Sequence, residues 1–261
     1  VAAAMEMDTA LLSKFERDER KLNKEQVLAF AKYYNVNADE LLLAWLSDKI
    51  AGEVQNEDLA KEAKKEKLEI RDSLYVTLTD HINSAVARYR EGIALKNMMK
   101  IDIRKFYPKE YQVGMHAIEW IKEQTGEDLG DDEAAFIAMH IVSAELNAQN
   151  ITDVNQITEL INTVLQIVRI HFKIDLNEES ISYERFLTHL KFFAARVFDH
   201  MEYEDTMQEI YKVMVEQNEN AFSGVKKIAE YIKKQYNYKL TIDEQLYLLI
   251  HIKRILDEQT K

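Results

Sequence analysis

The stretch LGDDEAAFIAMHI, residues 129–141, returns about 111 residues later as LTIDEQLYLLIHI, residues 240–252. Five of the thirteen positions are identical, and several others are conservative substitutions, such as Phe136 against Tyr247. In both copies an Asp-Glu pair precedes an apolar run that has helical spacing. A repeat of this length indicates a duplicated domain.

Each copy also contains a glutamate followed seven residues later by a histidine. These residues are Glu133 and His140 in the first copy, and Glu244 and His251 in the second. Seven residues make almost two helical turns, so the members of each pair share one helix face. Histidines are strong functional candidates because imidazole changes charge near physiological pH.

An earlier helix repeats in the same way and supplies a second histidine to each copy. His81 matches His189, and an arginine follows seven residues later in both copies, Arg88 and Arg196. The repeated segments are residues 73–91 with 181–199, and residues 119–124 with 230–235. Three helices that recur in one order predict a tandem duplication of a helical-bundle domain.

The composition favours a nearly all-helical protein. Of 261 residues, 47% are hydrophobic, which is enough for two cores, while only 6 are Gly and 1 is Pro. We therefore predict an all-α chain of two homologous bundles behind a short helical segment. The predicted boundaries are residues 1–54 for that segment, 55–150 for the first domain and 151–261 for the second.

Charge and cysteine content narrow the function classes. A formal net charge of −12 argues against broad binding to nucleic acid or membrane surfaces. The chain has no cysteine, which excludes disulfides, thiol nucleophiles and thiolate metal sites. No apolar run is long enough to span a membrane, and the N-terminus lacks a signal-peptide pattern. The sequence predicts a cytoplasmic protein.

The N-terminal segment has a different character from the repeats. Its pattern resembles the back half of a repressor-type helix-turn-helix domain, in which a recognition helix would carry Leu12, Ser13, Glu16 and Arg17. The two helices that precede the recognition helix in that family are missing, and Asp18 replaces the usual Gly. We expect a packing, linking or dimerising role, and keep a DNA-binding repressor as the alternative function.

The repeated motifs resemble the paired regulatory domains of the BglG/LicT family of transcriptional antiterminators. The resemblance rests on the runs at residues 78–82 and 132–137, on His140, and on their counterparts at His189 and His251. It covers roughly residues 68–261. It implies a non-catalytic regulator, controlled through histidine phosphorylation by the phosphotransferase system of sugar uptake, that switches its dimer arrangement.

The resemblance also implies specific phosphoacceptors and partners. His81 and His140 would form a first pair that receives an inhibitory phosphate under control of the sugar permease. His189 and His251 would form a second pair that receives an activating phosphate from the phosphocarrier protein HPr. The pairs would face each other near a homodimer interface. The family's N-terminal RNA-binding domain, rich in β-strands, has no counterpart in the sequence, which gives no support for RNA binding.

Several charged residues could tune such a switch. Phosphorylation adds nearly two negative charges to an imidazole. Arg88 or Arg196 could stabilise the phosphate, whereas Glu133 or Glu244 would repel it, and Asp80 stands beside the first histidine in the motif.

An enzyme or metal protein is the competing class. Zinc ligands on a helix normally stand three or four residues apart, whereas the Glu-to-His spacing is seven, and no glycine-rich phosphate loop is present. We expect neither a metal nor a cofactor.

Overall fold

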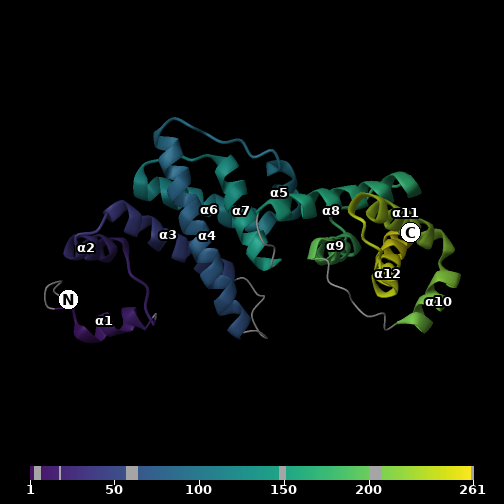
Figure 1. The fold of residues 1–261 in the computed structure, drawn as a ribbon, viewed down its shortest axis with the longest axis horizontal. Coiled ribbons are helices and arrows are strands. Elements are labelled where there is room, and N and C mark those ends of the chain that lie inside the picture. The colour runs from purple at the N-terminus through teal and green to yellow at the C-terminus, as the bar shows by residue number, and fades with distance from the viewer. Residues whose placement is uncertain (3–6, 18, 57–63, 147–150, 200–206, 260–261) are drawn as a thin grey trace. The chain divides into compact units, whose positions relative to one another are not determined.

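The computed structural model describes residues 1–2, 7–17, 19–56, 64–146, 151–199 and 207–259, all of which form helices or connections between helices (Figure 1). No strand occurs in those ranges, so the all-α prediction is confirmed. None of the helices there has the length and apolar character of a membrane span. The helices are α1 (Thr9–Glu16), α2 (Lys24–Tyr34), α3 (Ala38–Asn56), α4 (Lys64–Arg90), α5 (Lys100–Phe106), α6 (Pro108–Thr125), α7 (Asp131–Glu145), α8 (Ile151–Phe172), α9 (Ile181–Asp199), α10 (Gln208–Gln217), α11 (Glu219–Tyr236) and α12 (Ile242–Gln259).

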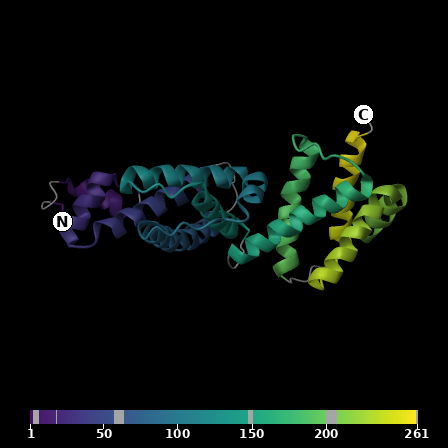
Figure 2. The same cartoon turned by 90° about the horizontal axis from the view of Figure 1, so that it is seen from above.

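The chain divides into two compact units, Val1–Glu145 and Leu146–Lys261. Among the described residues, helices α3 to α7 form a bundle in the first unit and helices α8 to α12 form one in the second (Figures 1 and 2). The bundles use the same helix contacts in the same order. In the first, α3 packs on α4 and α6, and α7 packs on α4, α5 and α6. In the second, α8 packs on α9 and α11, and α12 packs on α9, α10 and α11. The repeated sequence segments therefore form equivalent helices with equivalent contacts in the two bundles.

Helix α3 opens the first bundle, as α8 opens the second. Its side chains Leu43, Leu46 and Ile50 are buried in one core with residues of α4, α6 and α7. The repeat spacing alone predicts an opening helix near residues 59–67, where the composition is polar. Residues 57–63 lie outside the described ranges, and residues 64–67 begin α4 instead. The apolar face that the first bundle needs therefore comes from residues assigned to the N-terminal segment.

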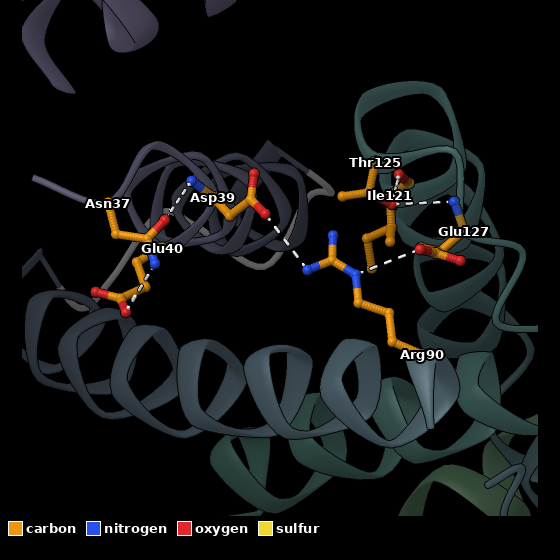
Figure 3. A network of polar contacts seen from close by, with 7 residues as sticks. All are labelled: Asn37, Asp39, Glu40, Arg90, Ile121, Thr125 and Glu127. Carbon is orange, nitrogen blue, oxygen red and sulfur yellow. Dashed lines mark hydrogen bonds and ion pairs between the residues drawn. The ribbon is translucent and has the colours of Figure 1, made fainter. Parts of the chain in front are cut away.

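An exposed polar network also joins α3 to the first bundle (Figure 3). The Arg90 guanidinium, at the end of α4, lies 3.3 Å from a carboxylate oxygen of Asp39 and 3.3 Å from one of Glu127. Asp39 belongs to the first turn of α3, and Glu127 follows α6. Exposed ion pairs contribute little to stability, so the buried leucine and isoleucine side chains are the main attachment of α3.

Side-chain caps mark the starts of the two helices before α3. The Asp8 carboxylate accepts a hydrogen bond from the Ala10 amide at the start of α1. Asn23 and Gln26 form a reciprocal capping box at the start of α2. Helix α1 has no buried residue.

Candidate functional site

The four repeated histidines come from equivalent helices of the two bundles. His81 lies on α4 and His140 on α7, while His189 lies on α9 and His251 on α12. Each pair therefore spans a helix–helix contact, α4 with α7 and α9 with α12. In both pairs the centroids of the two imidazole rings are 4.7 Å apart. Histidines about sixty residues apart in the sequence are thus brought into direct contact.

In the first bundle a buried carboxylate lies against the first histidine. Nε2 of His81 is 2.7 Å from Oε1 of Glu133, and their side chains are 13% and 8% exposed. The buried Nε2 of His81 has no hydrogen-bond partner among the described residues, so this contact is a close approach of the two groups. The Arg88 guanidinium lies 3.5 Å from the same glutamate oxygen. Asp80 is exposed on α4, and no described contact joins it to either histidine.

In the second bundle a tyrosine takes the place of that carboxylate. The Tyr247 hydroxyl lies 2.5 Å from Nδ1 and 3.2 Å from Nε2 of His189. Phe136, the counterpart of Tyr247, has no hydroxyl and only its ring faces His81, with centroids 6.0 Å apart. A cavity of about 10 Å³, room for about one water molecule, lies between both histidines, Arg196 and Glu244.

Glu244 is held away from its histidine by the start of α12. The Thr241 amide donates to Oε2 of Glu244, and the Glu244 amide donates to the Thr241 hydroxyl, which is a capping box. The Tyr238 hydroxyl donates to Oε1, and Arg196 Nε lies 3.6 Å from that oxygen. An arginine therefore lies close to the glutamate in both bundles, but of these two glutamates Glu133 alone forms a close contact with a described histidine.

Burial keeps the second histidine of each pair neutral. Burial, with a smaller effect of His81, lowers the pKa of His140 to about 3. Burial, followed by the charges of His189, Arg254 and Arg185, lowers the pKa of His251 to about 4. The pKa of His189 is also lowered, chiefly by burial and then by Arg196. A neutral imidazole has a free nitrogen lone pair, which makes it a nucleophile.

Two features of the second histidine pair, the Tyr247 contact and the Thr241 cap, were not predicted from the sequence. The sequence showed that tyrosine replaces phenylalanine at residue 247, but contact with His189 requires the packing of α12 on α9. The capping role of Thr241 could have been found from the T-x-x-E pattern that it forms with Glu244. Among the described residues, no group of three or more metal-binding side chains could hold a metal ion.

Two bundles of one design, each with a histidine pair beside an arginine and a glutamate, define a duplicated histidine-pair module. A family profile described as the PRD domain matches residues 58–144 and 162–255. The chain is 44% identical over 191 residues to the transcription antiterminator LicT of Bacillus subtilis (strain 168), covering 72% of this chain and 68% of that protein. It is 37% identical over 201 residues to the beta-glucoside operon antiterminator of Dickeya chrysanthemi, covering 75% and 71%. The chain therefore belongs to the BglG/LicT family of PRD-containing antiterminators.

Proposed function

We propose that this chain is the regulatory region of a transcriptional antiterminator that senses sugar availability through histidine phosphorylation by the phosphotransferase system. The phosphoacceptors are His81 and His140 in the first PRD, and His189 and His251 in the second. HPr and a sugar-permease component are the phosphoryl donors, and phosphorylation switches the arrangement of a homodimer. The role is regulatory, not enzymatic, in keeping with relatives that are named as antiterminators.

The observation that carries this proposal is the repeated histidine pair. Two rings 4.7 Å apart, each pair on two different helices, recur in two bundles with an arginine and a glutamate close by. A single histidine inside a helix is more often a packing residue. Duplicated pairs at equivalent contacts, within motifs of the PRD, favour a shared chemical role.

Phosphoryl transfer between histidines needs only the acceptor imidazole and the donor phosphohistidine. A ring nitrogen of the acceptor attacks phosphorus, a new N–P bond forms, and the N–P bond of the donor phosphohistidine breaks. The acceptor ring then loses its N–H proton, and the departing donor imidazole takes up a proton. The product carries nearly two negative charges between packed helices, so it changes which arrangement of those helices is favoured.

We also propose a domain division that follows the packing. The family profile begins at residue 58, close to the expected boundary at residue 55. Because α3 supplies buried side chains to the first bundle, we place the structural start of the first domain at Ala38. Helices α1 and α2 then precede this domain within the same compact unit, and α2 packs on α3. The use of these two helices as a DNA-binding segment is less favoured, since the relatives are named antiterminators rather than repressors.

Transfer from phosphoenolpyruvate through the general phosphotransferase proteins tests the proposal. The full chain is incubated with enzyme I, HPr and labelled phosphoenolpyruvate, and each of the four histidines is replaced in turn by alanine. We expect acid-labile label that falls when His189 or His251 is replaced. The exposed His171 is the control, because its replacement should leave the label unchanged. Undiminished label in all four variants would overturn the assignment of the phosphoacceptors.

A further inference from the structure

The two histidine pairs share their geometry but differ in what contacts the first histidine. The ring separation is 4.7 Å in both pairs, and an arginine lies 3.5 or 3.6 Å from the glutamate in both. Neither feature can make the pairs behave differently. The unequal contacts are the Glu133 carboxylate on His81 and the Tyr247 hydroxyl on His189.

We propose that these two contacts set how readily each pair takes a phosphoryl group, so that the second pair is the stronger intrinsic acceptor. Glu133 opposes phosphorylation of His81, and Tyr247 is a positioning residue that favours phosphorylation of His189. This inference rests on the proposed function, because it concerns the same histidines.

Electrostatic repulsion explains the effect of Glu133. Attack through Nε2 of His81 requires the Glu133 carboxylate, 2.7 Å away, to move aside. Attack through Nδ1 places the phosphate on the other side of the same imidazole ring, still close to the carboxylate. The side chain of Glu133 is 8% exposed, so water screens the repulsion poorly. Like charges at such distances disfavour the phosphorylated state strongly.

The start of the helix explains why the two glutamates differ. In the second bundle Thr241 and Glu244 cap α12, and Tyr238 also donates to the carboxylate. The residue equivalent to Thr241 is Gly130, with a φ of 79°, where a β-branched residue would be strained. The first bundle therefore has no side chain to complete the capping box, and Glu133 lies on His81 instead.

Hydrogen bonding explains the effect of Tyr247. If Nδ1–H of His189 donates to the tyrosine oxygen, Nε2 carries the free lone pair that attacks phosphorus. The hydroxyl proton then remains available to donate to a phosphoryl oxygen, because that hydroxyl is 3.2 Å from Nε2. A phenylalanine, as at residue 136, offers neither interaction.

Phosphoramidate tests the inference without any partner protein. This small donor transfers its phosphoryl group to imidazole as the P–N bond to ammonia breaks, and the proton lost by the ring is taken up by ammonia. The full chain is treated with it, and phosphate on each histidine is measured by peptide mass. We expect more phosphate on the second pair of the wild-type protein. Glu133→Gln should raise phosphate on the first pair by roughly tenfold.

Two control variants test whether the effect is specific to the Glu133 carboxylate. Glu127→Gln removes another carboxylate of the first bundle that pairs with an arginine, and it should change nothing at His81. Glu244→Gln removes the charge of the equivalent carboxylate, which lies 3.6 Å from Arg196, and it should change phosphate on the second pair by less than about threefold. The role of Glu133 would be overturned if Glu244→Gln raised phosphate on the second pair equally, or if Glu133→Gln lowered phosphate on His81.

Tyr247→Phe should lower phosphate on His189 by roughly three- to tenfold, the equivalent of one hydrogen bond. Tyr211→Phe is the matched control, because it loses one hydroxyl contact in the same unit, to Gln245. Ring-nitrogen chemical shifts should report a change in the tautomer ratio of His189 in Tyr247→Phe alone. An unchanged tautomer ratio and unchanged labelling would reject the role of Tyr247. Because the phosphoramidate assay contains no HPr, its outcome does not depend on the outcome of the transfer assay.

Discussion

Acid should destabilise the second bundle through His251, which is 5% exposed. Burial lowers the pKa of its ring from an ordinary value of 6.5 to about 4 in the folded protein. Between these values the unfolded chain binds the proton and the folded chain does not. The contribution of His251 to the free energy of unfolding is therefore fully present above pH 6.5, and it decreases as the pH falls toward 4.

The size of this effect follows from the two pKa values. At pH 5 the linkage relation gives a loss of about 2 kcal/mol relative to pH 8, and about 3 kcal/mol once the pH is below both values. A loss of that size is a substantial part of the stability of a small domain. His251→Gln keeps a polar side chain of similar length but cannot titrate.

Urea denaturation of the wild-type protein and His251→Gln between pH 8 and pH 5 measures the effect. We expect the free energy of unfolding of the wild-type protein to fall by about 2 kcal/mol more than that of the variant. His171→Gln changes an exposed histidine of the same unit and should retain the wild-type pH dependence. Parallel pH profiles for the wild-type protein and His251→Gln would refute the reasoning.

Three further predictions concern the scaffold. Gly114→Ala places a methyl group 2.2 Å from the Ala134 carbonyl oxygen, so α6 must move from α7, and we expect a loss of about 3 kcal/mol in urea denaturation. Leu46→Ala should lower the stability of the first unit by about 2–5 kcal/mol and speed amide exchange in α7, which would show that α3 belongs to that core. Thr241→Val should cost the second unit about 1 kcal/mol through the lost cap, measured by its thermal midpoint, with amide exchange at Glu244 increased.

The sequence predicted those parts of the fold that depend on local periodicity and on the repeat. The helix expected over residues 181–199 has those bounds, and the four histidines fall on matched helices. The seven-residue spacing predicted that Arg88 shares a face of α4 with His81, and in the structure both side chains lie against Glu133. A helix face is a local property, which explains this success.

Contacts that depend on tertiary packing could not be predicted. The repeat spacing predicts the opening helix of the first bundle near residues 59–67, but burial of apolar side chains decides which helix fills that position, and α3 has the leucines. The different contacts of Glu133 and Glu244 could not be predicted either, because both residues occupy the same position of the repeated motif. Their difference comes from Gly130 and Thr241 at the helix start, and from the helix that packs opposite.

Mapping of phosphate on the wild-type chain after incubation with enzyme I, HPr and phosphoenolpyruvate tests the central claim most directly. Peptide masses recorded under conditions that preserve phosphohistidine locate each modified residue. We expect phosphate on His189 or His251, whose ring centroids are 4.7 Å apart. A chain that carries no phosphate on any of its four paired histidines would contradict it, and the pairs would then be structural.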